Sequence, residues 1–288
     1  MAPGTDGRLH VGSTTSALAP ETRARNADIP VVILAGGLGT RLREETERVP
    51  KPMVRIGEQP ILWHIMKLYG SYGFRRFVLC LGYKSEVVKE FFLSYREQLS
   101  DLRIDLTGRR APEVLSGPPV EDWDVVCAET GLYTGTGGRL LRVRDYIDAD
   151  TFMFTYGDGI GSVDLQALLE HHRTHGRAAT VTGVRPTSRY GEMEIDGSAV
   201  VEFNEKPTAS EGVVSGGFFV FDRKVFDYLS TEPDLLLEQE PLRKLARDGE
   251  LSVFEHHDFW LGMDTYRDLT ALNELWSSGR APWRCWDS

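Results

Sequence analysis

Short apolar runs alternate with stretches of helical periodicity along most of this chain, and this alternation constrains its fold more than any other feature. The runs expected to be strands are 31–34, 77–81, 125–127, 152–156 and 178–184. Apolar residues at helical spacing occupy the stretches between them, at 61–72, 85–95, 138–147 and 163–175. Strands that alternate with helices of this length form βαβ units with parallel strands. The expected fold is therefore α/β, with a doubly wound, mostly parallel, Rossmann-like sheet and a small C-terminal extension.

The remaining segments are less regular. Residues 200–203 and 217–221 are strand-like, and 266–276 is expected to be a closing helix. Residues 100–124 carry several turn residues and are expected to be irregular or to form hairpin strands. The first 28 residues are rich in Ala, Gly, Thr, Pro and Arg and lack the apolar segment of a secretion signal. We expect a disordered tail over residues 1–28 and one folded domain over residues 29–288.

Composition narrows the class of protein. The net charge is −10, from 43 acidic and 33 basic residues, which argues against nonspecific binding to nucleic acid. No apolar stretch approaches the roughly 20 residues that span a bilayer, so no membrane partner is expected. Cys80 and Cys127 lie in strand-like runs and are expected to be buried, reduced thiols, and Cys285 is expected to be unpaired. These features favour a cytoplasmic protein and leave a small phosphorylated substrate open.

A glycine-rich loop follows the first expected strand directly. Its sequence is Ala35-Gly36-Gly37-Leu38-Gly39-Thr40-Arg41. Three glycines leave the backbone bare, so that its N–H groups can approach phosphate oxygens, and Thr40 and Arg41 can add a hydroxyl and a guanidinium. The spacing matches neither the Walker A loop nor the G-x-G-x-x-G dinucleotide fingerprint. By itself the loop is also compatible with a tight turn and an incidental arginine.

Two charged residues strengthen the phosphate interpretation. Lys51 stands between Pro50 and Pro52, on a stiff backbone that can hold a cation at a reacting phosphate. Asp158 stands between two glycines at the end of an expected strand. The glycine-rich loop and Asp158 both fall at the carboxyl edge of the sheet, where such folds bind ligands.

The loop and Lys51-Pro52-Met53 together resemble the signature of sugar-nucleotide pyrophosphorylases, the sugar-1-phosphate nucleotidylyltransferase superfamily. The first part of that signature is the run from Leu34 to Leu42. Longer strings resemble the glucose-1-phosphate cytidylyltransferase branch, at 60–67, 155–159, 205–207, 216–220 and 238–242. The resemblance extends over residues 31–286. It implies that residues 29–288 form a nucleotidyltransferase catalytic domain with a small sugar-binding C-terminal extension.

The same resemblance implies a set of site residues. The catalytic residues would be Arg41, Lys51, Asp158 and Lys206. The nucleotide-binding residues would be Leu34, Ala35, Gly36, Gly37, Leu38, Gly39, Thr40, Arg41, Lys51, Thr130, Thr136, Gly137 and Gly157. The sugar-phosphate-binding residues would be Glu205, Lys206, Gly191 and Gly217. Asp158 and Asp264 would bind Mg²⁺, although a turn or helix-cap role stays open for each from the sequence alone.

The reaction implied is Mg²⁺-dependent transfer of CMP from CTP to α-D-glucose 1-phosphate, which gives CDP-glucose and pyrophosphate. A homo-oligomer is also implied. One alternative keeps the reaction and changes the nucleotide to GTP, dTTP or UTP, or the sugar phosphate to that of another sugar or a cyclitol. Another alternative is a noncatalytic regulatory protein that binds sugar nucleotides, which the presence of Lys51, Asp158 and Lys206 disfavours. A dinucleotide-dependent sugar oxidoreductase is disfavoured by the missing fingerprint.

One segment departs from the cytidylyltransferase pattern. Leu132-Tyr133-Thr134-Gly135 stands where that pattern has Asp-Ser-Ser-Met, near the base and ribose in the family. Ser215 and Leu261-Gly262 depart on the sugar side. We expect a pyrimidine base, with CTP ahead of dTTP and UTP, and we expect residues 132–135 to decide how sharply the bases are discriminated.

Three histidines, His171, His172 and His175, fall on one expected helix. A spacing of four residues could bind zinc, but no HExxH context or matching third ligand accompanies them. A polar helix face is therefore favoured over a metal site.

Overall fold

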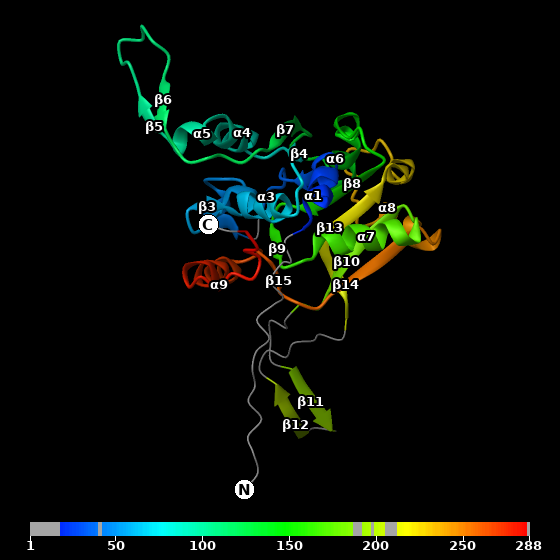
Figure 1. The fold of residues 1–288 in the computed structure, drawn as a ribbon. Coiled ribbons are helices and arrows are strands. Elements are labelled where there is room, and N and C mark those ends of the chain that lie inside the picture. Colours follow the sequence, from blue (N-terminus) through cyan, green and yellow to red (C-terminus); the bar gives the residue numbers. More distant parts are fainter. Residues whose placement is uncertain (1–17, 40–41, 187–191, 197–198, 205–211, 287–288) are drawn as a thin grey trace.

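The computed structural model describes residues 18–39, 42–186, 192–196, 199–204 and 212–286. At its centre is a seven-stranded sheet with the strand order β14-β10-β13-β8-β1-β4-β7 (Figure 1). Its strands are β1 (Pro30–Leu34), β4 (Arg76–Leu81), β7 (Asp124–Glu129), β8 (Thr151–Tyr156), β10 (Ala179–Val184), β13 (Val214–Asp222) and β14 (Leu251–His256).

The sheet is parallel except at one strand. β1 pairs in parallel with β4 and β8, β4 with β7, and β10 with β14. β13 is inserted antiparallel between β8 and β10. The predicted doubly wound, mostly parallel α/β fold is therefore confirmed. β14 was not predicted, because a half-exposed edge strand carries no continuous apolar run.

Helices cover both faces of the sheet. Besides the N-terminal helix described below, the longer helices are α3 (Ile61–Ser71), α4 (Ser85–Leu93), α6 (Thr136–Arg142), α7 (Leu165–His175), α8 (Glu240–Arg247) and α9 (Tyr266–Ser277), and α2 (Arg43–Thr46) and α5 (Tyr95–Gln98) are single turns. Val31 and Ile33 of β1 belong to one hydrophobic cluster and Val32 to a second, because successive side chains of a strand point to opposite faces. Both faces of β1 are thus buried except at its last residue, Leu34, which is partly exposed.

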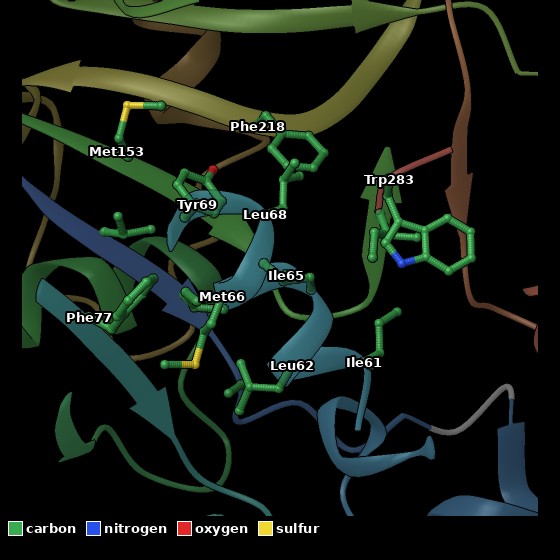
Figure 2. Packing of buried hydrophobic residues seen from close by; sticks show 14 of the residues in the cluster. Ile61, Leu62, Ile65, Met66, Leu68, Tyr69, Phe77, Met153, Phe218 and Trp283 are labelled. Carbon is green, nitrogen blue, oxygen red and sulfur yellow. The ribbon is translucent and has the colours of Figure 1, made fainter. Parts of the chain in front are cut away.

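α3 is apolar nearly all round and lies inside the larger cluster. Ile61, Leu62, Ile65, Met66, Leu68 and Tyr69 are each at most 1% exposed. They pack against Phe77, Met153, Phe218 and Trp283 (Figure 2). Full burial of one such side chain contributes about 1.5–3 kcal/mol. Because Ile61 N donates to Val54 O at 2.9 Å, this buried helix also anchors the segment that carries Lys51.

The N-terminal segment is more ordered than predicted. α1 (Pro20–Ala27) forms within the expected disordered tail, so that prediction is wrong for these residues, and residues 1–17 lie outside the described chain. Asn26 is buried, and its Nδ2 donates to Tyr72 O at 2.8 Å and to Gln166 Oε1 at 2.9 Å. These long-range hydrogen bonds, which local composition does not reveal, fix the helix on the domain.

Four small two-stranded sheets complete the described fold. They are β2 (Arg55–Ile56) with β3 (Gln59–Pro60), β5 (Asp101–Arg103) with β6 (Glu113–Ser116), β9 (Gly159–Gly161) with β15 (Trp260–Gly262), and β11 (Glu192–Asp196) with β12 (Ala199–Asn204). The hairpin alternative for residues 100–124 is confirmed by β5 and β6, which project from the body of the domain (Figure 1). All three cysteines are free, with Cys80 buried and Cys127 half-buried. None of the helices in the described ranges is long and apolar enough to cross a lipid bilayer.

Two buried histidines predict how stability depends on pH. His64 Nε2–H donates to Ile56 O at 2.8 Å, and burial lowers the pKa of His64 to about 4. His172 pairs with Thr180 Oγ1 at 2.9 Å, and burial, helped by the neighbouring His175, lowers its pKa to about 4. Between pH 6.5 and pH 4 the unfolded chain binds protons that the folded chain does not, so stability falls as the pH falls.

We therefore expect the free energy of unfolding to drop by about 2 kcal/mol per histidine between pH 7.5 and pH 5. Urea denaturation at both pH values measures this change. His64→Gln removes one titrating group and should flatten the dependence, whereas His257→Gln, at an exposed position, should not. An equally steep dependence in His64→Gln would exclude His64 as a source.

Candidate active site

A cleft of about 800 Å³ opens at the carboxyl edge of the sheet, where the parallel neighbours β1 and β8 end. This is the edge at which α/β sheets bind ligands. Its walls come from the glycine-rich loop, from Lys51 and Pro52, from the end of β8, and from two segments at 132–139 and 234–239. The lining residues are Leu34, Gly36, Gly37, Leu38, Gly39, Lys51, Pro52, Leu132, Tyr133, Thr134, Gly135, Thr136, Arg139, Tyr156, Gly157, Asp158, Asp234, Leu236 and Gln239.

The glycine-rich loop is held close to the turn after β4. Ala35 N donates to Cys80 O at 3.0 Å, and Tyr83 N donates to Gly36 O at 3.1 Å. A side chain at Gly36 would lie 2.7 Å from Gly82 N, so the close approach requires glycine there. The predicted nucleotide-binding residues that line the cleft here are Leu34, Gly36, Gly37, Leu38 and Gly39. Ala35, also predicted, is buried behind the cleft wall.

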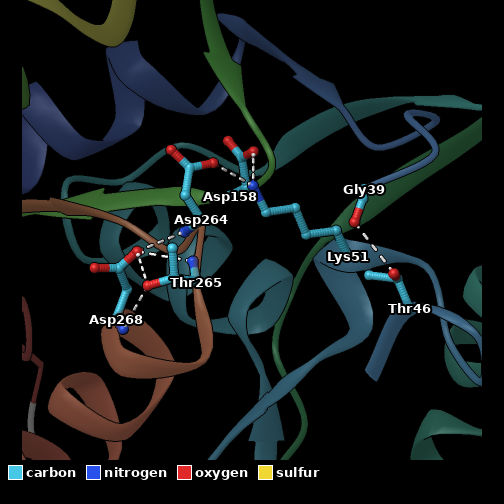
Figure 3. A network of polar contacts seen from close by, with 7 residues as sticks. All are labelled: Gly39, Thr46, Lys51, Asp158, Asp264, Thr265 and Asp268. Atoms are coloured by element: carbon cyan, nitrogen blue, oxygen red, sulfur yellow. Dashed lines mark hydrogen bonds and ion pairs between the residues drawn. The ribbon is translucent and has the colours of Figure 1, made fainter. Parts of the chain in front are cut away.

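Lys51 is held between two carboxylates. It begins the short 3-10 helix η2 (Lys51–Met53) and is 7% exposed. Its Nζ donates to Asp158 Oδ2 at 2.7 Å and to Asp264 Oδ1 at 2.8 Å (Figure 3). Burial by itself would lower the pKa of Lys51, but the attraction of Asp158 and Asp264 outweighs burial and raises it. Lys51 is therefore a fixed cation at neutral pH.

A small sheet brings the two carboxylates together. β9 begins directly after Asp158 and pairs antiparallel with β15, which ends shortly before Asp264. Gly159 lies opposite Gly262, and Met263 N donates to Asp158 O at 2.8 Å. The pairing of these short strands thus sets both aspartates beside the same ammonium group.

The helix-cap alternative for Asp264 is wrong. The N-cap of α9 is Thr265, whose Oγ1 accepts from Asp268 N at 3.3 Å while Asp268 Oδ2 accepts from Thr265 N at 2.8 Å (Figure 3). This reciprocal arrangement is a capping box. Because Thr265 and Asp268 cap the helix, the Asp264 carboxylate is directed to Lys51.

Asp158 and Asp264 also suit a divalent metal ion. Carboxylate oxygens are ligands that Mg²⁺ prefers, and the Lys51 ammonium lies between them as a metal cation would. In the described ranges, this site included, no group of three or more His, Cys, Asp or Glu side chains is placed to hold a metal ion, so the protein would supply two carboxylates here. Magnesium sites commonly use one or two carboxylates, with substrate phosphates and water as the other ligands.

The other predicted site residues that the structure describes take different positions. Gly157 N donates to Leu34 O at 2.9 Å on the cleft floor. Thr136 also lines the cleft, but Thr130 and Gly137 are buried behind its wall. Gly217 does not line the cleft. It packs against the ring of Tyr156, and Tyr156 does line the cleft. Thr130, Gly137 and Gly217 therefore lie behind cleft residues, and the binding roles expected of them remain predictions.

Arg139 is a cleft residue that sequence reasoning missed. It is 4% exposed, and its guanidinium donates to Leu81 O, Thr130 Oγ1, Gly36 O and Leu132 O at 3.0, 2.7, 3.0 and 3.2 Å. Burial lowers its pKa. Arg139 ties the glycine-rich loop to the loop at 130–132, and the only sequence signal was an arginine directly after two glycines.

Some predicted site residues lie outside the described chain, namely Thr40, Arg41, Gly191, Glu205 and Lys206. The roles expected of them remain predictions.

Known proteins match this chain over nearly its whole length. The family model described as nucleotidyl transferase matches residues 30–277. The chain is 45% identical over 255 residues to the probable glucose-1-phosphate cytidylyltransferase of Bacillus subtilis (strain 168), a match that covers 88% of this chain and 99% of the relative. It is 46% identical over 257 residues to the glucose-1-phosphate cytidylyltransferase of Salmonella typhimurium, covering 89% and 99%.

Two solved structures share the fold. HddC from Yersinia pseudotuberculosis matches with a TM-score of 0.62 and 24% identity, covering 86% of this chain and 99% of that one. The inositol-1-phosphate CTP transferase from T. maritima matches with a TM-score of 0.59 and 20% identity, covering 87% and 96%. At these identities the likeness shows the fold alone.

Proposed function

The chain belongs to the nucleotidyl transferase family and is a sugar-1-phosphate nucleotidylyltransferase, and from this premise we propose that it transfers CMP from CTP to α-D-glucose 1-phosphate. The products are CDP-glucose and pyrophosphate. The observation that carries the proposal is the Lys51 ammonium, held by Asp158 and Asp264 in a cleft beside the glycine-rich loop. Relatives named glucose-1-phosphate cytidylyltransferase support this choice of substrates.

The proposed reaction brings two anions together. An oxygen of the sugar phosphate attacks the α-phosphorus of the nucleotide, and the bond from that phosphorus to the oxygen of the β-phosphate breaks in line as pyrophosphate leaves. No covalent enzyme intermediate is needed, so catalysis consists of positioning and charge neutralisation. An ammonium group has three donor hydrogens, and the two carboxylates engage two of them, so Lys51 can still donate to a phosphate.

We propose Mg²⁺ as the cofactor, with Asp158 and Asp264 as its protein ligands. The family generally uses a divalent metal. When bound, the ion neutralises charge on the triphosphate and makes the phosphorus more electrophilic. The pairing of β9 with β15 sets both carboxylates side by side at Lys51, which supports this assignment.

For the sugar phosphate we propose Lys206 as a second cation, with Glu205 and Gly191 on the sugar, and with Gly217 acting through Tyr156. A separate cation for each substrate offsets the repulsion between their phosphates. This assignment is supported by the resemblance of the string at 205–207 to the cytidylyltransferase branch.

We also propose that the protein is a homo-oligomer. Ile104 and Leu106, at the outer end of the β5–β6 hairpin, are 58% and 95% exposed. A contact between subunits would remove such apolar area from water. Light scattering should then give a mass that is a multiple of 32.4 kDa, and a monomer at micromolar concentration would contradict the proposal.

The decisive test of function is pyrophosphate release across a matrix of nucleoside triphosphates and sugar 1-phosphates. We expect CTP with glucose 1-phosphate to give the highest kcat/KM, and a competing base to be roughly tenfold or more worse, since one mismatched buried polar group costs about 1–3 kcal/mol. A purine triphosphate that wins by tenfold would refute the base assignment alone. Tight sugar-nucleotide binding without turnover for any pair would instead favour the regulatory protein.

A further inference from the structure

A second segment, residues 233–239, builds the wall of the cleft beside residues 132–136. Gly135 N donates to Pro233 O at 2.7 Å, and Gly137 N donates to Leu235 O at 2.9 Å. A side chain at Gly135 would lie 2.6 Å from Asp234 O, so this approach requires glycine. Gly135, which departs from the cytidylyltransferase pattern, therefore allows residues 233–239 to form part of the cleft wall.

Hydrogen bonds of Glu238 and Thr136 hold residues 233–239 against residues 132–136. Thr136 Oγ1 donates to Glu238 Oε2 at 2.6 Å and accepts from Leu237 N at 2.8 Å. The Tyr156 hydroxyl donates to the other carboxylate oxygen of Glu238. Both oxygens of Glu238 are thus engaged within the protein, which leaves this carboxylate a structural role.

The side chains around the wall are of two kinds. Leu132, Tyr133 and Leu236 line the cleft with 40%, 81% and 39% of their surface exposed, and such apolar area suits the faces of a base. Asp234 and Gln239 line the cleft beside them. Within the described chain, neither of these polar side chains has a hydrogen bond or an ion pair, so both are available to a ligand.

We propose that Asp234 determines the base specificity, because its carboxylate accepts a hydrogen bond from the exocyclic amino group of cytosine. This inference rests on the proposed function. An ionised carboxylate can only accept hydrogen bonds, and cytosine presents an N4 donor where uracil and thymine present an O4 acceptor. Gln239 cannot discriminate in this way, because its amide donates or accepts according to its rotation. Asp234 thus supplies the polar recognition that Leu132 and Tyr133 do not.

The test is the ratio of kcat/KM for CTP to that for UTP, with glucose 1-phosphate as the acceptor. Asp234→Asn, whose amide can donate to O4, should lower this ratio at least tenfold, and Asp234→Ala should lower it less. The change should appear in kcat/KM, because the proposed contact is made to the base and not to the reacting phosphates. Gln239→Ala should lower kcat/KM for CTP and for UTP by the same factor. Glu232→Gln removes the same charge at an exposed position outside the cleft lining and should change nothing.

The outcomes separate this inference from the function on which it rests. If the native enzyme prefers CTP and Asp234→Asn keeps the same ratio, the inference fails and the proposed function stands. A native preference for UTP or dTTP overturns both. A native preference for GTP that collapses in Asp234→Asn overturns the CTP assignment but supports Asp234, because guanine also carries an exocyclic amino group.

Discussion

Replacement of Lys51 by methionine is expected to lower kcat for nucleotidyl transfer by roughly 100-fold or more, which corresponds to about 2.7 kcal/mol of lost transition-state stabilisation. Methionine keeps an unbranched stem in a position that is 7% exposed, so the local packing should survive. The charge that offsets the developing negative charge on the phosphates is lost. The measurement is pyrophosphate release at saturating concentrations of both substrates, with thermal unfolding as the check on folding.

A surface lysine provides the matched control. Lys89 pairs with Glu129 away from the cleft, with 37% of its side chain exposed, so Lys89→Met should leave turnover unchanged. Lys51→Arg keeps the charge but places it on a planar guanidinium group, so we expect this variant to retain only part of the native activity. Near-normal turnover in Lys51→Met would mean that the ammonium serves only to pair Asp158 with Asp264.

Asp158→Asn is expected to abolish metal-dependent turnover, with a fall of roughly 100-fold or more and little change in unfolding temperature. Asparagine keeps the shape of the side chain but loses the charge that holds a hard cation. The ion pair with Lys51 also disappears, yet 40% of the Asp158 side chain is exposed, so solvent screens most of its contribution to stability. The measurement is activity against Mg²⁺ concentration, together with calorimetric titration of Mg²⁺ into the enzyme with CTP.

An aspartate that only caps a helix provides the control for Asp158. Asp164 caps α7, where its carboxylate accepts from Gln166 N and Ala167 N. Asparagine caps a helix as well as aspartate does, so Asp164→Asn should be nearly silent. Asp264→Asn should reproduce the defect of Asp158→Asn. The metal assignment would be untenable if Asp158→Asn had the Mg²⁺ response and the turnover of Asp164→Asn.

Local patterns in the sequence predicted the scaffold and the edge at which the cleft opens. The strands around β1 could be placed because buried parallel strands are continuous apolar runs, and the glycine-rich loop and Asp158 end neighbouring strands. Lys51 was recognisable because two prolines restrict its backbone. Each of these signals lies within a few residues of the feature that it predicts, so no knowledge of distant contacts was needed.

Distant contacts decided the rest. Lys51, Asp158 and Asp264 meet only because β9 pairs with β15, and hydropathy says nothing about which short strands pair. Arg139 becomes a cleft residue because carbonyl oxygens from three separate segments accept hydrogen bonds from it. Asp234 becomes a cleft residue because Gly135 leaves room for residues 233–239, which follow it in the chain by about 100 positions. Hydrogen bonds and close packing act between groups within a few ångströms in space. Residues far apart in the chain therefore acquire a joint function only once the tertiary fold has brought them together.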